Sequence, residues 1–185
     1  MQQPNWFIGF VVPHEGWFDA LERTPVGARY FNREDLHVTL SFLGAVEEAD
    51  AMRAWQVATR FEHEAFSFPL GHIEPMGPAH APTAWAVVPR QPILELNTFL
   101  ATRRNLLASA AYARPDSRPP RPHITVARPK RLASAKQRAE LERWAESQNV
   151  PQISVTLDQI ALYTWSQERD HRLFRIVARH RIAPA

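Results

Sequence analysis

The sequence predicts an α+β fold, a bilobal and pseudo-symmetric duplication in which two antiparallel sheets face a central cleft and the helices lie on the outside. Three observations predict it: alternating apolar residues mark short strands, segments with helical spacing separate them, and both halves repeat the order strand, helix, strand, helix, strand. The 185 residues are 45% apolar, enough for a core, and no long linker divides them. We expect one domain over residues 1–185, made of two interleaved lobes.

In the first half, alternation bounded by glycine or proline predicts strands at residues 5–12, 36–43 and 66–75. Helical spacing predicts a short helix at residues 14–23 and a longer one at residues 47–64. The longer helix carries Met52, Trp55, Ala58 and Phe61 on one side, so that side should face the core.

The second half starts the same order again. It predicts strands at residues 83–88, 123–127, 152–165 and 171–182, and helices at residues 92–112 and 134–148. A loop rich in proline and arginine follows the first of these helices, at residues 114–121. This loop is either a mobile flap beside a site or, because of its prolines, a stiff one.

Composition limits the chemistry of the chain. With no cysteine, a disulfide, a thiolate metal site and a cysteine nucleophile are excluded, and a reducing cytoplasm is expected. No stretch approaches the roughly 20 uninterrupted apolar residues of a membrane span, and the N-terminal apolar run has no basic region before it. We expect a monomeric cytoplasmic protein with no membrane partner.

Arginine dominates the basic residues, although the formal net charge is only +3. Positions 114 to 138 hold eight basic residues and one acid, Asp116. Because the guanidinium fork matches phosphate oxygens, this bias favours a phosphate or nucleic-acid partner. The alternative is a solvated arginine-rich face with no binding role.

Two apolar runs share one pattern, a histidine followed two residues later by a threonine. "DLHVTLSFLG" contains His37 and Thr39, and "RPPRPHITVARPKR" contains His123 and Thr125. Residues i and i+2 of a strand share a face, so each histidine points the same way as its threonine. One such match arises easily by chance, but two at corresponding places of similar halves do not. The alternative is a pair of core histidines beside threonines that favour strands.

Facing strands would present two imidazoles and two hydroxyls to one small volume. Histidine titrates near neutrality, so one ring can accept a proton while the other donates one. This suffices for acid–base cleavage of a phosphoester without a metal or other cofactor, with the threonines holding the non-bridging oxygens. No HExxH, His-x-His or carboxylate cluster at metal spacing accompanies the motifs, so no metal site is expected.

At these residues the sequence resembles the two-histidine (2H) phosphoesterase superfamily, and most closely its RNA 2′,3′-cyclic phosphodiesterases, also named 2′-5′ RNA ligases. "LHVTLSFLG" is similar to the first motif of that branch and "RPHITVARP" to the second, and the element order is similar from "WFIGFVVP" to "LFRIVARH". The resemblance implies hydrolysis of a cyclic phosphate, with His37 as proton donor to the leaving 3′-oxygen and His123 as the base that activates water. The sequence departs from the pattern at Ser41, where a basic residue is common, and at "DHRLFRIV", where a tyrosine often lies.

The expected partners are RNA ends or small nucleotides with a cyclic phosphate. Strict alternation puts Arg128 on the face opposite His123, so it reaches the cleft only if its strand ends or bulges after Ala127. A base can stack on an aromatic residue, and the candidates are Tyr30, Trp85, Tyr163 and Trp165. Alternation argues against Phe42, which it puts on the core face, and His171 is held as a further cleft candidate.

The sequence is also compatible with two other functions. One remains enzymatic: ligation of RNA ends to a 2′-5′ linkage, or hydrolysis of another cyclic or 2′-5′ linked nucleotide. The other is a non-catalytic RNA-binding module that uses the basic loop. Substituting both histidines separates the classes, because only an enzyme would lose turnover.

Overall fold

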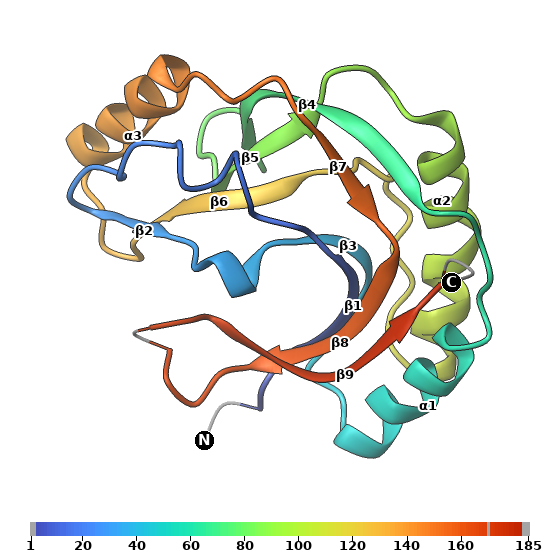
Figure 1. The fold of residues 1–185 in the computed structure, drawn as a ribbon. Coiled ribbons are helices and arrows are strands. Elements are labelled where there is room, and N and C mark those ends of the chain that lie inside the picture. The colour runs from blue at the N-terminus through green and yellow to red at the C-terminus, as the bar shows by residue number, and fades with distance from the viewer. Residues whose placement is uncertain (1–2, 170, 183–185) are drawn as a thin grey trace.

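The computed structural model describes residues 3–169 and 171–182 and confirms the α+β class (Figure 1). Its elements are β1 (Trp6–Val11), β2 (Ala28–Tyr30), the 3-10 helix η1 (Arg33–Asp35), β3 (His37–Gly44), α1 (Glu48–Ala58), β4 (Phe66–Met76), β5 (Ala84–Pro89), α2 (Leu94–Ala110), β6 (Ile124–Pro129), α3 (Ala135–Ser147), β7 (Ser154–Leu157), β8 (Gln159–Trp165) and β9 (Phe174–Arg181). Within those two described ranges, no helix is long and apolar enough to cross a membrane.

The strands form one antiparallel sheet and not the two sheets that the sequence predicts. Their order is β7-β4-β5-β6-β3-β1-β8-β9, with β2 added beside β6. The halves β7-β4-β5-β6 and β3-β1-β8-β9 meet through a single paired position, Val38 with Ile124. Each half begins at that junction with its His-x-Thr strand, so the predicted pairing of the two motifs takes place inside one sheet.

The sheet is curved so that its two ends approach one another. Strand β7 lies at one end of the order and β8 next to the other end, yet only Asp158 separates them in the chain. The predicted strand at residues 152–165 is therefore two strands. Asp158 fixes the crossing, because its carboxylate pairs with Arg181 at 2.9 Å and its carbonyl accepts from the Ile182 N–H. Figure 1 shows the resulting C shape, open between β2 and the turn that joins β8 to β9.

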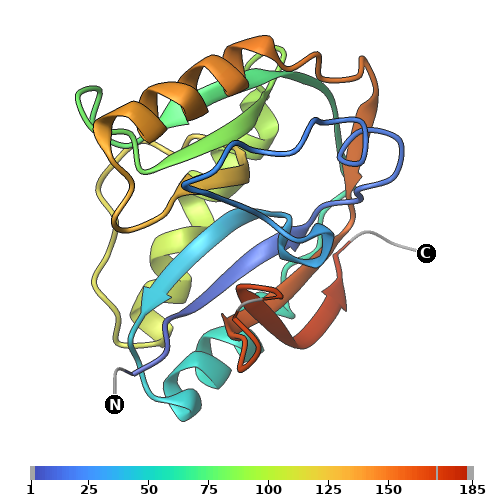
Figure 2. The same cartoon turned by 90° about the vertical axis from the view of Figure 1, so that its left-hand side faces the viewer.

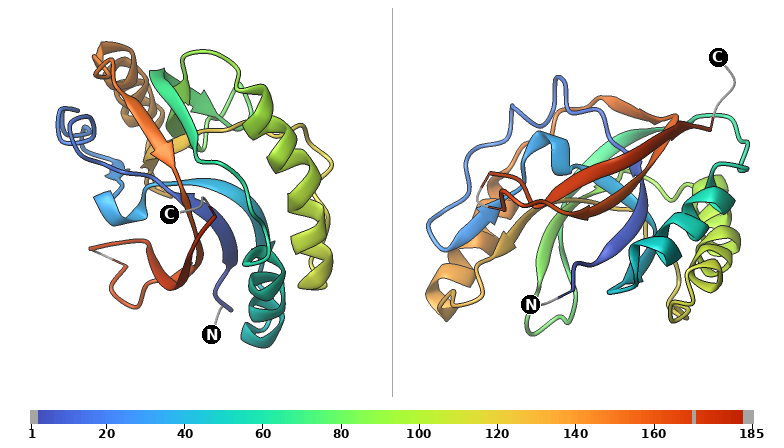
Figure 3. Two further views of the ribbon diagram at one scale, coloured as in Figure 1. Left: turned by 45° about the vertical axis from the view of Figure 1, so that its right-hand side comes forward. Right: turned by 90° about the horizontal axis from the view of Figure 1, so that it is seen from below.

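Three helices cover the outside of this curve. Helix α2 packs on β3 and α1 packs on α2, whereas α3 packs on β2, β4 and β6. Figure 2 looks into the open side, with α3 along the top, and Figure 3 shows α1 and α2 together on the side away from α3. Each helix buries an apolar stripe, which in α2 includes Leu96, Phe99, Leu100 and Leu107.

The predicted helix at residues 14–23 is wrong, because the chain there forms a series of turns. Gly16 adopts a positive φ of 77°, which interrupts a right-handed helix. The segment is instead held by Trp17, which is fully buried and donates its indole N–H to the Pro13 carbonyl at 2.7 Å. The helical spacing of its apolar residues reflects burial of aromatic rings and not a helix.

Candidate active site

The two His-x-Thr motifs lie side by side where the halves of the sheet join. Val38 and Ile124 form the pair at this junction, and each is 1% exposed. The positions that flank an antiparallel pair point to the other face of the sheet. That face carries the four motif residues, His37 beside Thr125 and Thr39 beside His123. The two histidines are thus diagonal neighbours, a relation that separates residues by about 7–8 Å.

The two imidazole rings are held in the same way. His37 Nδ1 contacts the Asp35 carbonyl oxygen at 2.6 Å, and His123 Nδ1 contacts the Arg121 carbonyl oxygen at 2.7 Å. A carbonyl only accepts hydrogen bonds, so Nδ1 carries the proton in both rings. Each neutral ring therefore keeps Nε2 as a free acceptor, which is the atom that proton transfer requires.

Aromatic residues enclose the His37 ring. The ring centroids of Phe7, Tyr163 and Phe174 lie 4.5, 5.3 and 5.5 Å from that of His37. Burial, with smaller contributions from the neighbouring His123 and Arg128, lowers the pKa of His37 to about 4, and the hydrogen bond to the Asp35 carbonyl opposes this shift. Burial also lowers the pKa of His123. Both rings are consequently neutral at pH 7 when the site holds no anion.

Asp35 braces this side of the site. Its carboxylate is 1% exposed and accepts hydrogen bonds from the backbone N–H groups of Leu173 and Phe174 at 2.9 to 3.1 Å. Its carbonyl holds His37, so one residue links η1, the histidine and the start of β9. Burial raises the pKa of Asp35, and these N–H donors oppose that rise.

A β-bulge after each motif threonine changes the face of the sheet to which the following residues point. The pairing of β3 with β1 skips Leu40, and the pairing of β6 with β5 skips Val126. One extra residue shifts the alternation by one, so the third residue after each threonine returns to the open face. That residue is Phe42 in β3 and Arg128 in β6. Phe42 is 57% exposed, so the prediction that it faces the core is wrong.

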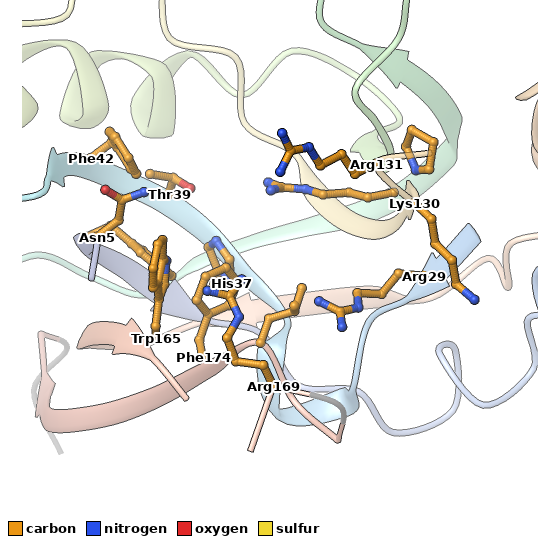
Figure 4. Close-up of a pocket in the computed structure, with 14 residues that line it drawn as sticks. Asn5, Arg29, His37, Thr39, Phe42, Lys130, Arg131, Trp165, Arg169 and Phe174 are labelled. Carbon is orange, nitrogen blue, oxygen red and sulfur yellow. The ribbon is translucent and has the colours of Figure 1, made fainter. Parts of the chain in front are cut away.

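Two pockets open on either side of the motifs and share Thr39, Phe42 and Arg128. The His37 pocket, shown in Figure 4, has a volume of about 560 Å³, and the His123 pocket has one of about 460 Å³. The first lies between β2, β3 and the turn after β8, and the second lies under α2 and the loop before β6. Together they form an open cleft that runs past both histidines.

Comparison with known proteins decides the family. The sequence model of the 2′-5′ RNA ligase superfamily matches residues 10–169. The chain belongs to this superfamily. The fold is similar to E. coli LigT in apo form (21% identity, TM-score 0.72, 99% of this chain and 100% of that one) and complexed with 3′-AMP (19%, 0.71, 98% and 99%), and to TT0787 of Thermus thermophilus (21%, 0.65, 96% and 97%). No curated protein sequence matches the chain significantly.

Three of the four aromatic residues that were predicted to stack on a base do not line the cleft of this 2′-5′ RNA ligase superfamily member. Trp85 is 2% exposed in the main core, and Tyr163 is fully buried behind Phe7, on which it stacks at 4.7 Å. Tyr30 stacks on Phe18 at 4.8 Å and donates its hydroxyl hydrogen to the Phe18 carbonyl. Trp85 and Tyr163 are buried, so the prediction that they contact a base is wrong, and Tyr30, which is partly buried, lies outside both pockets.

The structure does place Trp165 and Arg128 in the His37 pocket. The Arg169 guanidinium lies 4.4 Å from the centre of the Trp165 ring. Arg128 reaches the pocket because β6 contains a bulge, which strict alternation requires for Arg128 to lie on the same face as His123. His171 lies outside, because it lines a separate shallow hollow with Glu168 and Arg172.

Sequence reasoning missed several residues that line the cleft. They are Asn5, Phe7, Arg29 and Phe174 in the His37 pocket, and Arg104 and Asn105 in the His123 pocket. The sequence offered one signal for Phe42, namely that it follows its threonine by the same interval as Arg128. Within residues 3–169 and 171–182, no group of three or more His, Asp or Glu side chains is arranged to hold a metal ion.

The predicted loop at residues 114–121 lines the His123 pocket and is tied down at several points. Arg118 pairs with Asp116 at 2.8 Å and lowers the pKa of that carboxyl to about 2. The Asn105 side chain of α2 accepts from the Asp116 N–H at 3.1 Å, and Arg121 forms an ion pair with Glu74. These contacts link the loop to α2 and β4.

Proposed function

We propose that this chain hydrolyses the 2′,3′-cyclic phosphate of an RNA end or a nucleotide to a 2′-phosphomonoester, without a metal. One observation carries the proposal: two imidazoles with free Nε2 atoms lie diagonally across one antiparallel pair, each beside a threonine hydroxyl. This arrangement suits a single tetrahedral phosphate between an acid and a base. Membership of the superfamily supports the same chemistry.

The proposed reaction needs one proton to leave water and one to reach the sugar. His123 Nε2 accepts a proton from the attacking water, the new P–O bond forms, and the bond from phosphorus to the 3′-oxygen breaks. His37 Nε2 donates a proton to that oxygen, which leaves a 2′-phosphate and a 3′-hydroxyl. The threonine hydroxyls hydrogen-bond to the non-bridging oxygens, where charge builds up.

In this mechanism, binding of the substrate promotes protonation of His37. In the free protein, burial and, to a smaller extent, the positive charge of Arg128 hold the pKa of His37 at about 4. A bound phosphate anion favours the protonated ring, so it raises that pKa in the complex. A doubly protonated pair is disfavoured because the rings repel each other, which leaves one acid and one base.

The test follows adenosine 2′,3′-cyclic phosphate by ³¹P NMR in the presence of EDTA. The proposal expects adenosine 2′-phosphate as the product at an undiminished rate. Formation of the 3′-phosphate would contradict the stated bond cleavage, and loss of activity in EDTA with recovery on adding a divalent ion would contradict metal independence. Joining of RNA ends to a 2′-5′ linkage, with no hydrolysis, would assign ligation instead.

The rival reading as a non-catalytic RNA-binding module is separated by the variant with both His37→Ala and His123→Ala. A binding module would keep its affinity for RNA and would show no turnover to lose. The proposal expects the double variant to lose turnover while the wild-type chain hydrolyses the cyclic phosphate.

A further inference from the structure

The His37 pocket extends beyond the histidine pair into cations that the proposed reaction does not use. Figure 4 shows Arg29, Lys130 and Arg131 together on one side of this pocket, with His37 near its centre. Asn5, Phe42 and Trp165 lie on the opposite side. We call the three cations the basic limb. The pocket thus has an aromatic side, on which Arg169 lies over Trp165, and an opposite side formed by the three cations of the basic limb.

The register of β2 on β6 places two like charges face to face. Arg29 is the cross-strand partner of Arg128, so their side chains leave the sheet on the same face. Directly opposed like charges destabilise a sheet unless a counter-charge lies between them. Among the described residues that line this pocket, none is acidic. The pocket therefore presents positive charge that an anion would neutralise.

The His123 pocket provides the contrast. There Arg118 pairs with Asp116 and Arg121 pairs with Glu74, so carboxylates already neutralise these arginines. In the part of the chain that the structure describes, no carboxylate forms an ion pair with any of the three cations of the basic limb. Free positive charge in the cleft is concentrated on the His37 side.

The backbone holds the basic limb in place. Lys130 donates its N–H to the Gly27 carbonyl at 2.8 Å, directly after the paired positions Ala28 and Pro129. Gly27 has a φ of 94°, a conformation that favours glycine, and this turn brings β2 alongside β6. Arg29 thus projects from the paired ribbon, and Lys130 and Arg131 follow directly after its last paired position.

We propose that the basic limb binds a second phosphate, one nucleotide away from the cyclic phosphate, while the aromatic side receives a base. This inference rests on the proposed function, because it defines the second phosphate by its distance from the first. The shared chemistry is a phosphate on the 5′ side of the terminal nucleoside. It is the internucleotide linkage in an oligonucleotide and the 5′-phosphate in a mononucleotide.

The test compares kcat/KM for three substrates that end in the same adenosine 2′,3′-cyclic phosphate: the nucleoside form, its 5′-phosphorylated form, and the dinucleotide. We expect both two-phosphate substrates to exceed the nucleoside form. If kcat/KM exceeds that of the nucleoside form only for the dinucleotide, the basic limb recognises the internucleotide linkage. If kcat/KM is raised equally for both two-phosphate substrates, any phosphate at that position is sufficient. Equal values for all three substrates would overturn the inference.

Variants locate the effect. Lys130→Gln, Arg131→Gln and Arg29→Gln should each lower the preference for two phosphates about two- to fivefold, the range expected for one exposed ion pair. The wild-type preference should also weaken with salt, with a log–log slope of about 0.7 per phosphate contact. Arg60→Gln, at an exposed position after α1, is the control and should keep the full preference. An equal loss in Arg118→Gln, on the other side of the cleft, would show general attraction and overturn the inference.

Binding measurements distinguish failure of the proposed function from failure of the second phosphate site. If no substrate is turned over, calorimetry with adenosine 2′-phosphate and adenosine 2′,5′-bisphosphate still tests the limb. Tighter binding of the bisphosphate, lost in Lys130→Gln, would support the second phosphate site without the reaction. Equal affinity for the two ligands would overturn it.

Discussion

Lowering the pH from 7 to 4 should destabilise the fold through His37. Burial lowers the pKa of this ring from 6.5 to about 4. As the pH falls through this window, the unfolded chain binds a proton that the folded chain does not, so the free energy of unfolding decreases. At about 1.4 kcal/mol per pKa unit, the loss from this one ring is at most about 3 kcal/mol and is complete below the lower pKa.

Urea denaturation at a series of pH values measures this loss. Across the window, His37→Gln should lose less stability than the wild type, by about 3 kcal/mol, because it has no ring to protonate. His80→Gln is the matched control, since His80 is exposed, and it should follow the wild type. Inorganic phosphate should reduce the wild-type loss, because an anion in the cleft favours protonated rings.

Parallel pH profiles for the wild type and His37→Gln would refute this reasoning. They would mean that the folded chain protonates His37 as easily as the unfolded chain does. The enclosure of His37 by Phe7, Tyr163 and Phe174 would then not shield it from water.

Three further predictions concern catalysis. Gly9→Ala should lower kcat about tenfold, because its Cβ would lie 3.0 Å from the Val38 carbonyl, a tight contact with backbone, and would shift the strand that carries His37; an unchanged kcat would contradict this. Thr39→Ala should lower kcat/KM about tenfold, less than loss of either histidine, because one hydrogen bond to phosphate disappears; a loss as large as that of His37→Ala would assign Thr39 a larger role. A nitrophenyl phosphodiester, whose leaving group needs no proton, should restore turnover to His37→Ala and hardly to His123→Ala, and the reverse pattern would exchange the two roles.

The sequence predicted the parts of the fold that depend on local periodicity. Helices α1, α2 and α3 and the two His-x-Thr strands follow from apolar spacing and from proline and glycine at their ends. The single sheet was not predictable in this way, because it depends on one long-range pair, Val38 with Ile124, and on a crossing at Asp158. Periodicity carries no information about which strands become neighbours.

The residues of the candidate site also divide into those that local periodicity predicts and those that it does not. Repetition of a short motif was enough to select the four motif residues, since i and i+2 share a face whatever the topology. Phe42 was misjudged because a bulge in β3 adds one residue and reverses the alternation, which exposes its ring, whereas Arg128 reaches the cleft through the bulge that its prediction required. Trp85 and Tyr163 were misjudged because a large aromatic residue beside a motif fits a core as well as a binding site.

The most direct test of the central claim is kcat/KM for adenosine 2′,3′-cyclic phosphate in the wild type, His37→Ala, His123→Ala and the double variant, in EDTA. If the two rings act as acid and base on one phosphate, each single variant should lose about 10²–10⁴-fold. The double variant should then be little worse than either single one, because the rings act as a unit. Wild-type turnover in either single variant, or losses that multiply in the double variant, would contradict the account.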